Sequence, residues 1–361
     1  MKTTFFISAI ALSLIASGCG DLPEWGTEGI AYTPDGKVIA YLDGEIRFFD
    51  SDAKNELGSI KTGSQFGGWA PLAARYATSS NGGTLAVAAD HVVKVYDAQT
   101  RHLVANIPVS GYPDDHTPVA GLALSADGGL IAVSTRSNAP MENPSRLTVW
   151  RVSDVSLVTE IARGAGRESL SWGSTPVFSP DGSRLYGVDE GYTEAFNFVA
   201  YLAAWSIPDG AVIWETAMPS ANAPVDTPAQ LSAMDVLALS GDGVWLATGG
   251  FVLKMFRASD GMPQDLAPRE PFPTGLGSLH FSPDGQRLVA SHYSNAMPDP
   301  LVFGLDGVTL MAVPVEDSGC AESVFSTDGT RIVAACNPWL KIWDASSGEL
   351  LRKIEVTVPI Y

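Results

Sequence analysis

The residues of this chain that could support chemistry are few and widely spaced. The densest polar group is Asp114-Asp115-His116, whose carboxylates and imidazole could together bind a divalent cation. Solvated junction loops often have the same composition, so both interpretations stay open and the triplet is only a weak metal candidate. Five histidines lie along the chain without the spacing typical of metal ligands: His91, His102, His116, His280 and His292. His280 stands beside Phe281 in an expected strand, and we interpret it as structural.

Known catalytic signatures are missing from the sequence. It contains no Gly-x-Ser-x-Gly elbow, no His-Glu-x-x-His pair and no phosphate-binding Gly-Lys-Ser/Thr loop. Many aspartates fall in turn motifs, where local hydrogen bonding explains them without a catalytic role. We therefore expect neither a catalytic residue nor a cofactor, and a non-enzymatic function is favoured.

Two of the three cysteines flank one expected hairpin. Cys320 and Cys336 lie on either side of a turn centred on Asp328-Gly329, so they could face each other across two strands. Counting residues from the turn places their side chains on opposite faces unless a bulge intervenes. A disulfide and a pair of buried thiols therefore remain as alternatives.

The third cysteine follows an export pattern. Met1-Lys2 precede an apolar stretch from Phe5 to Ala16, which is too short to span a bilayer and has the length of a signal-peptide core. Ala16-Ser17-Gly18-Cys19 resembles the bacterial lipobox, although that motif favours Leu where Ala16 stands. The resemblance implies cleavage before Cys19 and lipid modification of its thiol. An ordinary secretory signal is the alternative.

This resemblance gives the expected organisation and location. Residues 1–18 form a lipoprotein signal peptide, residues 19–27 a short tether and residues 28–361 the folded part. Gly20 follows the cysteine in place of Asp, so the resemblance implies no retention at the inner membrane. We expect a lipid-anchored protein of the bacterial cell envelope, held at the outer membrane and facing either the periplasm or the cell surface.

The charge balance limits the partners. The chain has 22 basic and 40 acidic residues, a formal net charge of −18. Such a surface repels phosphate backbones, so nucleic acid is not an expected partner.

An octamer repeats along the chain. It reads aromatic or apolar, Ser/Thr, any residue, Asp/Asn, Gly, any two residues, then Leu/Ile. Its successive glycines are 46, 46, 54, 61, 42 and 44 residues apart. The seven copies are Tyr32 to Ile39, Thr78 to Leu85, Leu124 to Ile131, Phe178 to Leu185, Leu239 to Leu246, Phe281 to Leu288 and Phe325 to Ile332, with Thr78 a weak first member. Seven such units in order indicate a repeat protein.

Each octamer predicts a tight hairpin, because Asp binds its own backbone and Gly tolerates positive φ. An aromatic residue in a β-rich run follows each copy: Phe49, Tyr96, Trp150, Trp205, Phe256, Phe303 and Trp343. A second turn and a further apolar stretch come next, as in Ser346-Ser347-Gly348 and Leu350 to Val356. Four short strands per unit are typical of a propeller blade. We therefore expect an all-β fold, a seven-bladed β-propeller with four antiparallel strands per blade.

These units resemble WD repeats. The best match, Lys341-Ile342-Trp343-Asp344, carries the Trp-Asp pair that names the family, and Lys94-Val95-Tyr96-Asp97 is similar. No Gly-His dipeptide occurs, so the hydrogen-bond network of that family cannot be complete. Many members close the ring with a strand from the N-terminus. Here Glu349 to Val356 supplies the last strand, and we expect closure without strand exchange.

The resemblance implies one loop-rich face, where loops between second and third strands lie beside the loops that join blades. The longest insertions are Thr135 to Arg146, Glu190 to Asn197 and Tyr293 to Pro300. Length differences on one face of a repeat protein commonly mark its binding face. The candidate binding residues are Trp69, Tyr112, Asp114, Asp115, His116, Arg167, Trp172, Tyr192 and Phe196. Trp69 and Trp172 could equally fill gaps between blades.

Two functions follow. The favoured one is a membrane-anchored, non-catalytic scaffold whose loop-rich face binds another envelope protein or peptide. The alternative is a propeller enzyme of the lactonase or sugar-oxidising type, with a metal or quinone at the central channel. That alternative needs polar residues from several blades to converge on the axis, and matched repeat positions show no such cluster.

Overall fold

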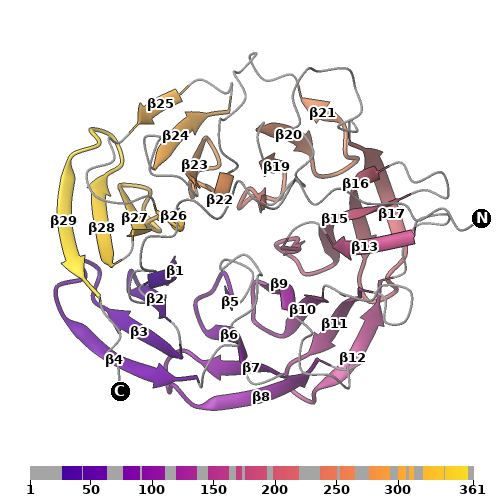
Figure 1. Ribbon diagram of the computed structural model, residues 1–361, viewed down its shortest axis with the longest axis horizontal. Coiled ribbons are helices and arrows are strands. Elements are labelled where there is room, and N and C mark those ends of the chain that lie inside the picture. Colours follow the sequence, from indigo (N-terminus) through magenta and orange to yellow (C-terminus); the bar gives the residue numbers. More distant parts are fainter. Residues whose placement is uncertain are drawn as a thin grey trace, which may run out of the picture.

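The computed structural model describes residues 27–42, 44–62, 76–89, 92–109, 119–135, 145–161, 168–172, 175–192, 198–218, 236–249, 253–264, 276–292, 300–305, 309–312, 320–336 and 338–356. These residues form seven antiparallel sheets that stand as blades around one axis (Figure 1). The described part is entirely β, and no helix in it has the length and apolar character to cross a membrane. The expected seven-bladed propeller is confirmed.

In each blade the strands follow one another outward from the axis in chain order. Blades 1 to 3 comprise β1 (Thr27–Tyr32), β2 (Val38–Leu42), β3 (Glu45–Phe49) and β4 (Glu56–Lys61); β5 (Tyr76–Thr78), β6 (Thr84–Ala89), β7 (Val92–Asp97) and β8 (Leu103–Pro108); β9 (Val119–Leu124), β10 (Leu130–Thr135), β11 (Leu147–Arg151) and β12 (Ser156–Glu160).

Blade 4 comprises β13 (Glu168–Trp172), β14 (Val177–Phe178), β15 (Arg184–Tyr192), β16 (Phe198–Ser206) and β17 (Val212–Ala217). Blades 5 to 7 comprise β18 (Val236–Leu239), β19 (Trp245–Gly249), β20 (Lys254–Arg257) and β21 (Pro263–Gln264); β22 (Leu276–Phe281), β23 (Arg287–His292), β24 (Leu301–Gly304) and β25 (Thr309–Ala312); β26 (Glu322–Phe325), β27 (Arg331–Cys336), β28 (Trp339–Asp344) and β29 (Leu350–Glu355). All four strands of blade 7 are consecutive in the sequence, which confirms closure without strand exchange.

Blade 4 departs from the regular pattern. Its innermost position is divided between β13 and β14, which both pair with β15. The hairpin of β15 and β16 stays in register from Arg184 opposite Ser206 to Tyr192 opposite Phe198. Residues Glu190 to Tyr192, expected in an insertion, therefore continue the strand.

The octamers form the turns between the first and second strands. In blade 7 the Ser326 hydroxyl donates to Asp328 Oδ1 at 2.6 Å and accepts the Arg331 N–H at 2.9 Å. The N–H of Gly329, whose φ is 70°, donates to the Ser326 carbonyl. Equivalent hydroxyls make the same bond to the turn Asp or Asn in the other blades: Thr33, Ser79, Ser125, Ser179, Ser240 and Ser282. The motif thus requires a hydroxyl, a short carbonyl-bearing side chain and a glycine.

The apolar core is divided into seven clusters, and each fills the gap between two adjacent blades. The third-strand aromatics enter these clusters; Trp205 and Phe303 are among the largest fully buried side chains. The gap between blades 7 and 1 is filled in the same way, for example by Val324 and Leu340 against Ile30 and Leu42. We call this gap the seam, because it joins the two ends of the repeat array.

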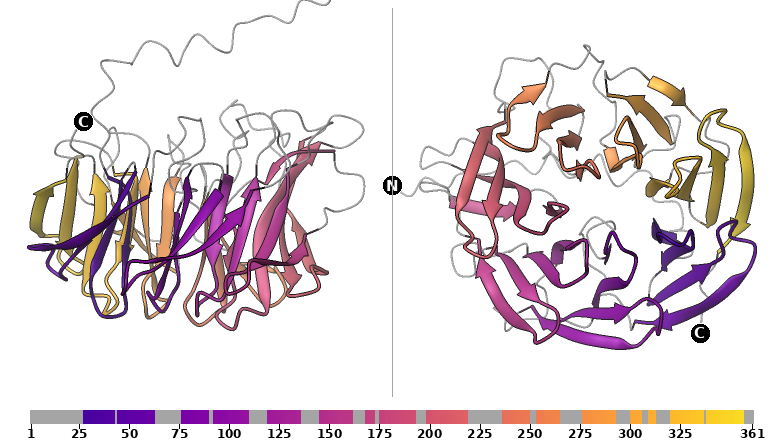
Figure 2. Two further views of the ribbon diagram at one scale, coloured as in Figure 1. Left: turned by 90° about the horizontal axis from the view of Figure 1, so that it is seen from below. Right: turned by 180° about the vertical axis from the view of Figure 1, so that it is seen from behind.

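The alternating strand directions give the ring two different ends. The octamer turns and the turns between third and fourth strands lie at one end, which we call the turn face (Figure 2). The second and third strands meet at the other end, where the outermost strand of each blade also leads to the next blade. We call this end the junction face. β1 begins there at Thr27, and β29 ends there at Glu355.

The turn aspartates predict an acid-sensitive fold. Hydrogen bonds from Ser179 and Ser183 lower the pKa of Asp181 to about 2, against an ordinary value of about 3.9 in the unfolded chain. Its contribution to stability is therefore complete above about pH 4 and is lost as the pH falls towards 2. We expect Asp181→Asn to flatten this loss, because Asn81 already fills the equivalent place in blade 2.

Denaturant unfolding at several pH values measures the effect. Asn81→Asp is the reciprocal variant and should steepen the loss over the same interval. At pH 7, Asp181→Ala should lower the free energy of unfolding by about 1–2 kcal/mol, because the turn then lacks its acceptor. An Asn variant with an unchanged acid limb would contradict this account of the turns.

Candidate functional site at the axis of the ring

Two of the sequence-predicted binding residues lie on neighbouring strands of blade 4. Trp172 stands opposite Asp189, and Tyr192 stands opposite Glu168, at the junction-face end of the blade. The remaining candidates lie outside the described residues: Trp69, Tyr112, Asp114, Asp115, His116, Arg167 and Phe196. Cys19 lies outside them too. Binding at the junction face and lipid attachment at Cys19 therefore stay predictions.

A polar cluster that the sequence did not reveal lies at the axis. Glu322 begins the innermost strand of blade 7, and its residue is only 6% exposed. Its Oε2 accepts the Ile30 N–H at 2.7 Å and the hydroxyl of Tyr76, and its Oε1 meets His280 Nε2 at 3.0 Å. The donors come from blades 1, 2 and 6. We call Tyr76, His280 and Glu322 the axial cluster.

These three contacts satisfy a group that is costly to bury. A carboxylate withdrawn from water destabilises a fold unless hydrogen bonds replace its hydration. Charge-assisted hydrogen bonds of this kind are stronger than neutral ones. The contacts of Glu322 are specific to the closed ring, because its partners belong to three blades other than its own.

Tyr76 reaches Glu322 by passing the innermost strand of blade 1. Gly29 lies on its path, and a Cβ atom there would overlap the phenol ring of Tyr76. The Tyr76 ring stacks on that of Tyr41, with centroids 4.1 Å apart, and the Tyr41 hydroxyl pairs with Thr78 Oγ1 at 2.6 Å. Burial raises the pKa of Tyr41, so its phenol stays neutral.

His280 is the accessible member of the cluster. Its side chain is 39% exposed, against 8% for the side chain of Glu322. In the tautomer whose Nε2–H donates to Glu322 Oε1, Nδ1 of the neutral ring is left as an acceptor. A carboxylate that orients an imidazole is an arrangement able to hold or transfer a proton. In the described ranges, no group of three or more His, Cys, Asp or Glu residues could hold a metal ion.

The repeat itself carried a signal for these residues. One position before the octamer holds only Ala or Val in the other six blades, whereas blade 6 has His280: Ala31, Ala77, Ala123, Val177, Ala238 and Val324. Glu322 lies three positions before the first residue of its octamer. In blades 1 to 6 the same position holds Gly29, Arg75, Gly121, Thr175, Val236 and Ser278. Comparing octamer flanks, and not only octamers, would have singled out both residues.

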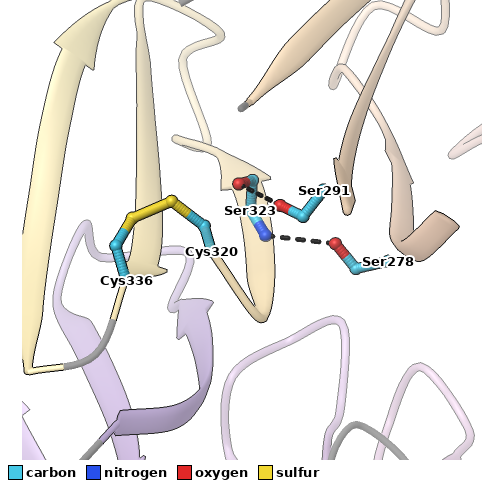
Figure 3. The surroundings of a disulfide bond; sticks show 5 residues. All are labelled: Ser278, Ser291, Cys320, Ser323 and Cys336. Carbon is cyan, nitrogen blue, oxygen red and sulfur yellow. Dashed lines mark hydrogen bonds between the residues drawn. A yellow bond between two sulfur atoms is a disulfide. The ribbon is translucent and has the colours of Figure 1, made fainter. Parts of the chain in front are cut away.

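The cysteines of blade 7 lie next to the axial cluster. Their sulfur atoms are 2.02 Å apart, forming a disulfide between Cys320 and Cys336 (Figure 3). Ser323 links the same strand to blade 6, since its N–H donates to Ser278 Oγ at 3.2 Å and its hydroxyl pairs with Ser291 at 2.5 Å. Covalent and hydrogen-bonded contacts thus converge on the start of β26.

The sequence comparisons assign the chain to no family. No known protein-family profile matches the chain. A search of curated protein sequences finds no match either.

The close approach at Gly29 can be tested by a double-mutant cycle. We expect Gly29→Ala to lower the free energy of unfolding by about 2 kcal/mol, because the added methyl displaces Tyr76 from Glu322. In a Tyr76→Ala background the same change should have almost no effect. Chemical denaturation of the four proteins measures the coupling. Equal losses in both backgrounds would contradict the proposed path of Tyr76.

Proposed function

We propose that this chain is a lipid-anchored, non-catalytic propeller of the WD-repeat type, which binds another protein or peptide in the bacterial envelope. The contrast between the two ends of the ring carries this proposal. At the turn face, residues 33–37 join β1 to β2 with a closed hydrogen-bond network. At the junction face, residues 218–235 separate β17 from β18. Variable connections on a rigid scaffold are the usual place for binding.

The position of β1 supports an anchor on the junction side. Thr27 starts this strand at the junction face, and residues 20–26 separate it from Cys19. An extended chain of this length spans at most about 28 Å. A lipid on Cys19 would therefore keep the junction face close to the bilayer. The partner of this face is then itself attached to, or held near, the membrane surface.

A propeller enzyme acting at the axis is the second candidate, and the His280–Glu322 pair favours it. The imidazole is partly exposed and is oriented by a carboxylate, as a general base requires. Both oxygens of Glu322 are already engaged by protein donors, however, so His280 alone is left to meet a substrate. We place this function second for that reason. Loss of a catalytic activity on His280→Ala, with the fold retained, would promote it.

Membrane attachment is tested by Cys19→Ala in cells. Each buried methylene of an acyl chain contributes about 0.8 kcal/mol, so loss of the lipid should transfer the protein from the membrane fraction to the soluble fraction. Tyr192→Ser, at the junction face, is the control and should stay with the membrane. A Cys19→Ala protein that still sediments with membranes would contradict lipid anchoring.

Partner binding is tested by site-specific photo-crosslinking in intact cells. A photoreactive residue at Trp172 or Tyr192 should give one adduct of the same mass, because both positions lie at the junction-face end of blade 4. The same residue at Asp181 or Asp344, on the turn face, should give none. The scaffold proposal fails if no junction-face position yields an adduct, or if both faces yield the same adducts.

A further inference from the structure

The disulfide of blade 7 depends on an irregularity at Glu322. Strands β26 and β27 pair regularly from Phe325 opposite Ile332 to Glu322 opposite Ala335. The Ala321 N–H then donates to the carbonyl of the same Ala335 at 2.8 Å. Two residues of one strand thus oppose a single residue of the other, which is the arrangement of a β-bulge.

This bulge moves the side chain of Cys320, the residue before it, to the other side of the sheet. In regular pairing Cys320 and Cys336 would point to opposite sides of the sheet, as the residue count from the turn implies. The extra residue brings Cys320 opposite Cys336, and Figure 3 shows the two side chains meeting. The disulfide therefore fixes the bulge, and the bulge sets the position of Glu322.

The contacts of Glu322 in turn protect the disulfide from reduction. Cys320 is 2% exposed and Cys336 is fully buried, both within the apolar cluster between blades 6 and 7. A reductant reaches the sulfur atoms only when the start of β26 moves away. Glu322 opposes that movement through blades 1, 2 and 6, and Ser323 opposes it through blade 6.

We propose that the Cys320–Cys336 disulfide and the Glu322 carboxylate form one redox-sensitive lock on the seam. A dithiol reductant opens it by thiolate attack on one sulfur atom, which breaks the S–S bond. The second thiol of the reductant then attacks the reductant's own sulfur in the mixed disulfide and releases the attacked cysteine as a free thiol. The two cysteines gain two electrons and two protons, and the reductant becomes a cyclic disulfide. The reduced chain releases the bulge, Glu322 loses its fixed position and the seam between blades 7 and 1 opens.

The rate of disulfide reduction in the folded protein tests this lock. Wild type, Glu322→Gln and Glu45→Gln are incubated with dithiothreitol without denaturant, and alkylated thiols are counted by mass. Glu45 is the matched control, because it is also buried but pairs with Arg47 and Lys61 inside blade 1. We expect Glu322→Gln to be reduced at least about tenfold faster than wild type, which corresponds to about 1.4 kcal/mol.

Glu45→Gln should stay within about threefold of wild type under the same conditions, without denaturant. The reverse coupling is measured by unfolding the oxidised and reduced forms of each protein. Reduction should lower the stability of wild type more than that of Glu322→Gln, since the variant has already lost part of the lock. Equal reduction rates in wild type and Glu322→Gln, or fully additive losses of stability, would overturn the proposal.

Discussion

A buried carboxylate requires hydrogen-bond partners in place of water, and the partners of Glu322 lie on three blades other than its own. This requirement makes the contact across the seam specific to the closed ring. Seven similar blades could pack side by side in an open array, but only a closed ring brings Ile30, Tyr76 and His280 together around one residue of the last blade. These hydrogen bonds form only in the closed ring, where they offset the cost of burying the carboxylate.

The rest of the ring needs no such device, because each blade follows its neighbour along the chain. Apolar clusters fill all seven gaps, and hydrogen-bonded turns fix the distance between the first two strands of every blade. At the seam, the described residues of the first and last blades share no strand. Among the described residues, apolar packing and hydrogen bonds that involve side chains hold it. The axial cluster, the seam's apolar cluster and Arg331 paired with Asp52 at 2.5 Å supply that contact.

Local patterns made the fold predictable, whereas the axial cluster depends on closure. The octamer predicts its turn from local sequence, because Ser326, Asp328 and Gly329 interact within four residues. Glu322 and Tyr76 are separated by 246 positions and meet only after the ring forms. The sequence alone does not decide the disulfide, because counting residues from the turn cannot show a bulge. The sequence indicates a structural role for His280, because its bond to Glu322 depends on a neighbour from the next blade.

The two faces of the ring differ in what the structure describes there: hydrogen-bonded turns stabilise the turn face, while β1 begins and β29 ends at the junction face. A ring closed by Glu322 requires the seam to be as fully folded as the other gaps between blades. Native-state hydrogen exchange of the Ile30 amide tests it most directly, because this N–H donates to Glu322. We predict exchange only through global unfolding, with the same free energy as the core amide of Ile332. Exchange of Ile30 at the rate of a fraying edge strand would contradict a seam closed by Glu322.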